Sequence, residues 1–168
     1  IIAGGQSLMP ILNMRLATPK ALVDINGLSE LTGITKSNGA IRIGSLTRIR
    51  ELISAPEVAE YAPLLKLAAP HIAHPAIRNR GTVGGSLCHA DPAAELPACI
   101  RVVDGRMNIT GPSGERIVES ENFFQGIFET SVLPGELLSS IDIPAIKIGE
   151  SVAFEEFVRR HGDYATLG

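Results

Sequence analysis

Residues 78–95 read RNRGTVGGSLCHADPAAE, and the rest of the chain is best interpreted around this stretch. Gly84 and Gly85 stand between Thr82 and Ser86. Because glycine has no Cβ, a glycine pair predicts a tight turn whose backbone can come close to a ligand. Successive backbone N–H groups in such a turn form a concave nest that suits an anion such as a phosphate. The hydroxyl groups of Thr82 and Ser86 would add donors at its rim.

A helix is expected directly after this turn. Asp91 as the N-cap and Pro92 at the first helical position are both favoured at a helix start. The partial positive charge of the helix N-terminus would then lie beside the nest. Glu95 falls one turn into the helix, on the side that faces the glycines. It either accepts a hydrogen bond from a ribose or ribityl hydroxyl or is exposed to solvent.

The chain opens with a second motif of the same kind, because residues 3–7 read Ala-Gly-Gly-Gln-Ser. A single glycine pair is weak evidence for binding, since many structural turns use one. Two pairs, each followed by a serine, predict one diphosphate held from two sides. Neither motif has the P-loop pattern G-x-x-x-x-G-K-[ST] or the Rossmann pattern G-x-G-x-x-G. The predicted diphosphate-binding residues are Ala3, Gly4, Gly5, Gln6, Ser7, Thr82, Val83, Gly84, Gly85 and Ser86.

The composition excludes several classes of protein. The 168 residues carry 15 basic and 18 acidic side chains, with five Phe, two Tyr and no Trp, so neither charge nor stacking rings favour nucleic acid. No apolar run is long enough to span a bilayer. Two cysteines, Cys88 and Cys99, cannot hold a zinc ion or an iron–sulfur cluster alone. We interpret both as small buried side chains, with a functional role for Cys88 as the alternative because it lies beside the glycine motif. His71 and His74 have no acidic or cysteine partner at ligand spacing, so no metal site is predicted.

Hydrophobic periodicity predicts an α+β chain. Asn38-Gly39 and Asp104-Gly105 are two-residue hairpin signals. A break in the second helix is expected at Pro63. The expected strands are 21–26, 34–37, 40–43, 102–103, 107–109, 116–118, 137–143 and 152–158, and the expected helices are 46–53, 58–68, 92–99 and 121–128. The chain starts at Ile1 without a Met, so we expect it to be a piece of a longer sequence.

These motifs resemble those of one family, the FAD-binding medium subunit of the molybdenum hydroxylases, of the aerobic carbon monoxide dehydrogenase flavoprotein type. Residues 3–7 are similar to the family's first flavin motif. Residues 77–86, continued by 89–97, look like its second, which is long and specific. Residues 134–138 and 160–166 also match, so the resemblance covers essentially the whole chain.

The resemblance implies a two-lobed FAD-binding domain of the vanillyl-alcohol-oxidase/xanthine-dehydrogenase type, truncated at both ends. Residues 1–54 would form the first lobe without its N-terminal part, and residues 55–168 the second, mainly antiparallel lobe, with the family's C-terminal domain absent. Both motifs would hold the FAD diphosphate, and Glu95 would lie near the sugar-alcohol region. Ile72 and Leu138 would line the flavin, and Tyr164 would lie beside its isoalloxazine ring.

The resemblance also implies partners. A large subunit would hold molybdopterin, and a small subunit would relay electrons through two [2Fe–2S] clusters to the FAD. The expected assembly is a dimer of these heterotrimers, in the cytoplasm or at the inner face of the membrane. Two alternatives stay open: a nucleotide-diphosphate binding module without redox activity, and another flavoprotein of the same fold, such as an enolpyruvyl reductase.

Overall fold

The computed structural model describes residues 1–37 and 39–168, and its base is an antiparallel sheet. Among these residues the sheet has five strands in the order β1-β2-β7-β3-β4, and every neighbouring pair is antiparallel. The central strand β7 joins two hairpin-like pairs, so residues distant in sequence share one surface. The strands are β1 Ile34–Ser37, β2 Ala40–Gly44, β3 Arg106–Gly111, β4 Gly114–Glu119 and β7 Leu137–Pro144.

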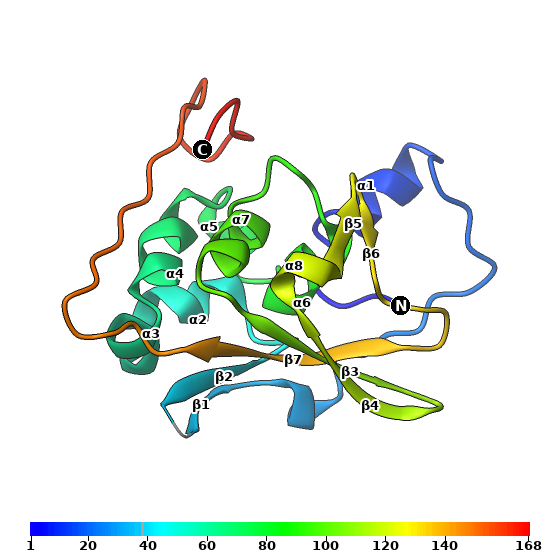
Figure 1. Ribbon diagram of the computed structural model, residues 1–168. Helices are drawn as coiled ribbons and strands as arrows, with labels where there is room; N and C mark the ends of the chain where they lie inside the picture. The colour runs from blue at the N-terminus through cyan, green and yellow to red at the C-terminus, as the bar shows by residue number, and fades with distance from the viewer. Residues whose placement is uncertain (38) are drawn as a thin grey trace.

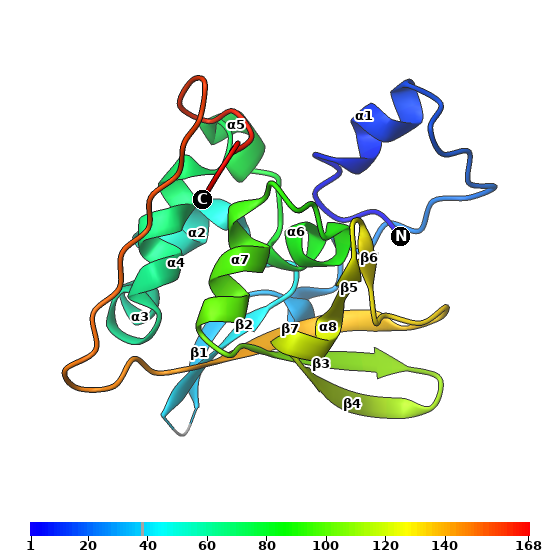
Figure 2. The same cartoon turned by 45° about the horizontal axis from the view of Figure 1, so that its top comes forward.

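Short helices cover one face of this sheet, as Figures 1 and 2 show. Alternate residues of the strands point at the helices, so Ile41, Ile43 and Ile141 are fully buried with Leu65 and Leu87 from the helical layer. The helices are α2 Ile49–Ser54, α3 Pro56–Tyr61, α4 Pro63–Ala68, α5 Pro75–Arg78, α6 Val83–His89, α7 Glu95–Val102 and α8 Ser120–Phe123, with the 3₁₀ turn η2 Ala69–His71.

The two ends of the chain pack onto this core in different ways. The N-terminal part contains α1 Leu8–Asn13 and η1 Ser29–Leu31, and a single parallel bridge joins Ile2 to Asp24. Residues 145–168 leave β7 and pass outside α3 and α4 to the top of the molecule in Figure 1, without a helix or named strand. A small two-stranded ribbon, β5 Phe124–Gly126 and β6 Glu129–Thr130, stands beside α6.

Several expectations are confirmed. The α+β class is correct, residues 34–37 and 40–43 pair as antiparallel strands, and residues 137–143 form the centre of the sheet. The chain breaks at Pro63, where α3 ends and α4 begins. Asn38 of the predicted hairpin lies outside the described residues. The lobe boundary after residue 54 stays a prediction, and β2 and β7 pair across it.

Other expectations are wrong. Asp104 and Gly105 do not form a hairpin, because residues up to Val102 belong to α7, and Gly105 instead lets the chain turn tightly against Ile100, where a Cβ would lie 2.8 Å from its Cγ2. The segments 21–26 and 152–158 contain isolated bridges and no strand.

The helix expected over 121–128 stops after one turn. Phe123 is buried, but Phe128 has φ 57° and is 57% exposed. The ribbon of β5 and β6 begins directly after Phe123, so the pairing of residues 124–130 replaces the rest of the expected helix.

Candidate functional site

The two glycine motifs meet at a cleft of about 900 Å³, within the range of ligand pockets. Thirteen of the fourteen residues predicted from the sequence line it. Val83 is the exception, because its side chain is fully buried in the core beneath the cleft. The thirteen are Ala3, Gly4, Gly5, Gln6, Ser7, Ile72, Thr82, Gly84, Gly85, Ser86, Glu95, Leu138 and Tyr164.

The first motif is fastened to the chain just before the second. Gly4 lies directly on the backbone of residues 80–81, where a Cβ would overlap the carbonyl oxygen of Arg80. The guanidinium of Arg48 donates to that same oxygen and to Oδ1 of Asn26 (2.8 Å). The Asn26 amide in turn donates to the carbonyl oxygen of Ala3 (2.8 Å). This chain of contacts holds the two motifs at a fixed separation.

The first motif offers backbone donors. Within the described residues, none of the N–H groups of residues 3–7 donates a hydrogen bond to another part of the protein. Gly5 has φ 71°, a left-handed conformation that favours glycine, and the Gln6 amide folds back to the Gly4 carbonyl oxygen at 2.8 Å. A run of free N–H groups around a left-handed residue is the backbone arrangement that binds phosphate oxygens.

The second motif is not the turn that we expected. Gly84 and Gly85 lie in the first turn of α6, and neither has a positive φ. Their N–H groups already have partners: Gly84 donates to the Ser45 carbonyl oxygen (2.8 Å) and Gly85 to Oγ1 of Thr82 (3.1 Å). The Thr82 hydroxyl is therefore the N-cap of α6, so it accepts from the helix backbone in the place where we expected a rim donor.

Gly84 is nevertheless required by the packing of α6. A Cβ on Gly84 would lie 2.5 Å from the Cβ of Ser45, because α6 rests on the loop between β2 and α2. Gly85 is exposed and lines the cleft, next to the half-buried Ser86. On this side of the cleft the backbone of α6 is exposed at Gly85, and the Ser86 hydroxyl lies beside it. A diphosphate can therefore approach the helix closely.

The helix with Glu95 begins later than expected. Its first residue is Glu95 itself, and the Asp91 carboxylate accepts from the N–H of Ala93 (2.9 Å) in the preceding loop. Burial raises the pKa of the Glu95 carboxyl, and the nearby charge of Glu156 raises it further. Partial burial raises the pKa of the Tyr164 hydroxyl, and the charges of Asp91 and Glu95 raise it further. Glu95 is thus half-buried at the cleft wall, as an acceptor for a hydroxyl would be.

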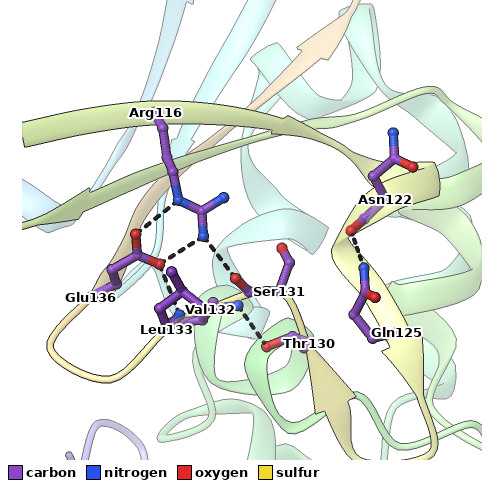
Figure 3. A network of polar contacts seen from close by, with 8 residues as sticks. All are labelled: Arg116, Asn122, Gln125, Thr130, Ser131, Val132, Leu133 and Glu136. Carbon is purple, nitrogen blue, oxygen red and sulfur yellow. Dashed lines mark hydrogen bonds and ion pairs between the residues drawn. The ribbon is translucent and has the colours of Figure 1, made fainter. Parts of the chain in front are cut away.

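The wall near Leu138 depends on an ion pair that sequence reasoning missed (Figure 3). Arg116 of β4 donates Nε to one oxygen of Glu136 (2.8 Å) and a terminal nitrogen to the other (2.6 Å) and to the Ser131 carbonyl oxygen (2.7 Å). Glu136 also accepts from the Leu133 N–H (2.8 Å) and lines the cleft. Arg116 and Glu136 are 20 positions apart, so no local pattern signals this pair.

These residues fit FAD. One side of the cleft supplies free backbone donors, and the other a bare helix surface with a serine. The apolar lining includes Ile72, Ile77 and Leu138, which suit a flat aromatic ring. When bound there, FAD supplies one- and two-electron transfer.

The comparison with known families agrees with this geometry. Residues 1–146 match the family described as the FAD binding domain in molybdopterin dehydrogenase. The chain belongs to this family. The resemblance noted from the motifs is therefore confirmed. The match favours a FAD-binding domain over the two alternatives, a diphosphate-binding module without redox activity and an enolpyruvyl reductase.

Two individual relatives also support membership of this family. This FAD-binding domain is 48% identical over its whole length to the 6-hydroxypseudooxynicotine dehydrogenase complex subunit alpha of Paenarthrobacter nicotinovorans, of which it covers 57%. It is 40% identical over its whole length to the carbon monoxide dehydrogenase medium chain of Hydrogenophaga pseudoflava, of which it covers 58%. The chain thus spans less than two thirds of the length of these relatives.

A solved structure shares the fold closely. The carbon monoxide dehydrogenase of Hydrogenophaga pseudoflava that lacks the Mo-pyranopterin moiety of its molybdenum cofactor aligns with a TM-score of 0.96 and 41% identity, over 98% of this chain and 57% of that chain. The two-lobed FAD-binding fold expected from the motifs is therefore the fold of this chain.

Three further results concern metals, membranes and cysteines. Across residues 1–37 and 39–168, no group of three or more His, Cys, Asp or Glu side chains could hold a metal ion. In the same residues, no helix has both the length and the apolar character needed to cross a bilayer. Cys99 is buried as expected, whereas Cys88 is exposed at the cleft, so its interpretation as a buried side chain is wrong.

Proposed function

We propose that this chain is the FAD-binding part of the medium subunit of a molybdenum hydroxylase. In this proposal electrons from the [2Fe–2S] clusters of a small partner subunit pass through the FAD to an external acceptor. A large partner subunit holds the molybdopterin and oxidises the substrate, as in carbon monoxide dehydrogenase. The observation that carries the proposal is the meeting of both flavin motifs at one cleft in a chain of this family.

The proposed binding residues divide into three regions of the cleft. The free N–H groups of residues 3–7 and the exposed side of Gly85 and Ser86 bind the diphosphate. Glu95 accepts from a sugar-alcohol hydroxyl. Ile72, Leu138 and Tyr164 surround the isoalloxazine ring. Thr82, Val83 and Gly84 act by shaping α6, since the Thr82 hydroxyl caps the helix and Val83 packs in the core.

The relay role follows from what the described residues can do chemically. They contain no cluster of metal ligands, and the cleft residues position a cofactor. A flavin alone offers hydride or one-electron transfer, so hydroxylation with water requires a partner. The relatives belong to enzymes named for substrates as different as carbon monoxide and 6-hydroxypseudooxynicotine. We therefore propose that the large subunit selects the substrate. We also propose that the complex is a dimer of heterotrimers in the cytoplasm.

The test uses the full-length subunit. Purified alone with FAD, it should show no turnover with carbon monoxide, purines or N-heterocycles. Addition of the iron–sulfur and molybdopterin subunits should bring substrate-dependent flavin reduction. Reduction of the FAD by substrate in the isolated subunit would contradict the relay and indicate a self-sufficient flavin oxidase.

A further inference from the structure

The C-terminal loop, residues 157–167, supplies one rim of the cleft. Its two ends are tied together, because the Phe157 N–H donates to the Leu167 carbonyl oxygen (2.7 Å) and the Thr166 N–H donates to that of Phe157 (2.9 Å). Four of its residues line the cleft: Arg159, Gly162, Asp163 and Tyr164. The Tyr164 side chain is 70% exposed, so its position depends on what holds the loop.

A contact between a buried carboxylate and a partly exposed imidazole lies at the base of this loop. Glu156 directly precedes it, and its side chain is only 2% exposed although the segment has no regular secondary structure. Its Oε1 lies 3.0 Å from Nδ1 of His71, at the end of η2. Its Oε2 is buried and has no hydrogen-bond partner in the part of the chain that the structure describes. Burial of a carboxylate is costly unless it is paired, so His71 is what keeps Glu156 in place.

The same histidine contacts the segment at two other points. Its ring packs edge-on against Phe154 (5.1 Å between centroids) and lies 5.7 Å from the ring of His161 within the loop. His71 also precedes Ile72, which lines the cleft. A single side chain of the helical layer thus contacts the segment on both sides of Glu156.

The far side of the loop fits closely against the helical layer. Gly162 has φ 85°, and a Cβ there would lie 2.7 Å from the carbonyl oxygen of Ala73. This contact is two residues from Tyr164. The pair at Glu156 and the close approach at Gly162 therefore hold the loop at two points, with the tyrosine beyond the second.

We propose that His71 and Glu156 form a latch that positions the C-terminal loop, and through it Tyr164, over the ring end of bound FAD. The inference rests on the proposed function, because Tyr164 contacts the ring only if FAD occupies the cleft. Within the described residues, neither member of the latch lines the cleft, so both are positioning residues. The carboxyl of Glu95 in α7, which lines the cleft, interacts electrostatically with both members of the latch.

The latch itself can be tested without cofactor in the full-length protein. Glu156→Ala should speed hydrogen exchange of residues 157–167 by about 10- to 100-fold, the effect of losing a hydrogen bond to a charged group. Glu150→Ala is the matched control, since Glu150 lies on the same segment in an exposed pair with Lys147 (3.8 Å) and should leave the exchange unchanged. Wild-type exchange in Glu156→Ala would overturn the latch.

The link to the flavin is tested with FAD bound. Glu156→Ala should alter the visible flavin spectrum and weaken FAD binding by about 2- to 10-fold, the size of an aromatic contact. In a Tyr164→Ala background the same change should have no further effect. An equal effect in both backgrounds, or none in either, would overturn positioning through Tyr164. If Glu156→Ala does not fold, His71→Ala breaks the same pair and takes its place.

The two proposals fail in distinguishable ways. If the wild-type full-length protein takes up no FAD, the proposed function fails, while the exchange measurement still reports on the latch. If FAD binds normally and the loop is unaffected by Glu156→Ala, the latch alone fails.

Discussion

Replacement of the two adjacent glycines of α6 by alanine should affect different properties of the protein, stability at Gly84 and FAD affinity at Gly85. Both glycines line the cleft, but Gly84 is buried against Ser45 and Gly85 is exposed. Alanine in a helix is favoured over glycine by about 0.5–1 kcal/mol, and this gain applies to both positions. What differs is the neighbour that an added methyl group meets.

At Gly84 the methyl group would lie 2.5 Å from the Cβ of Ser45 and 2.8 Å from its carbonyl oxygen. Both atoms belong to a buried loop that the Gly84 N–H itself holds, so they cannot move aside freely. Overpacking of this kind costs about 1–3 kcal/mol. With the helix gain subtracted, the expected loss is about 0–2.5 kcal/mol, and the 2.5 Å contact with a buried Cβ places Gly84→Ala in the upper half of that range.

At Gly85 the methyl group would lie 2.7 Å from Oγ1 of Thr82. That hydroxyl can rotate away, which forfeits a helix cap of about 1 kcal/mol. The helix gain offsets this loss, so Gly85→Ala should leave stability nearly unchanged. Its methyl group stands where the diphosphate is proposed to approach, so FAD affinity should fall by roughly 10- to 100-fold.

The assay is urea unfolding of both full-length variants without added FAD, together with titration of FAD fluorescence. A Gly84→Ala protein as stable as the wild type would refute the packing argument. A Gly85→Ala protein that binds FAD with wild-type affinity would refute the placement of the diphosphate.

Three further predictions concern the cleft wall. Tyr164→Ala should change the flavin spectrum and midpoint potential more than it changes stability, and unchanged spectra would place the ring elsewhere. Arg116 holds the pKa of Glu136 at about 2, below the unfolded value near 4.5, so the pair stabilises the fold above pH 4.5 and is lost as pH falls toward 2. Arg116→Ala should therefore destabilise more at pH 7 than at pH 2.5 in urea unfolding, and an equal loss at both would contradict the pairing. Burial raises the pKa of Glu95, so its charge costs stability above the folded pKa and this cost disappears as pH falls through it. Glu95→Gln should raise the free energy of unfolding at pH 7 without FAD and weaken FAD binding, and a lower unfolding free energy at pH 7 would contradict this.

Local chemistry was enough for the features whose signals lie within a few residues. The turn at Gly4-Gly5, the helix break at Pro63 and the strand over residues 137–143 were predicted correctly, because each depends on backbone freedom or on side-chain period alone. Thirteen of the fourteen predicted site residues line the cleft, and three of them, Ile72, Leu138 and Tyr164, came from the family resemblance. The motifs also carried the family resemblance that the comparisons confirmed.

Distant contacts decided the features that sequence reasoning missed. Gly84-Gly85 looked like a turn, yet the Ser45 carbonyl oxygen and the Thr82 hydroxyl satisfy its N–H groups and make it a helix start. Asp104-Gly105 looked like a hairpin, but α7 already occupies the residues before it. A tight turn and a tightly packed helix both need glycine, so the residue type alone does not separate them.

The sequence by itself determined the chemistry of the protein: two glycine motifs, an acid and an aromatic residue suited to a dinucleotide, in an α+β chain. Only the tertiary structure decided how they act together. Arg116 meets Glu136 across 20 positions and His71 meets Glu156 across 85, because strand pairing and helix packing bring them together. Such pairs leave no local pattern, since their energy depends on burial and distance that arise only when the chain has folded.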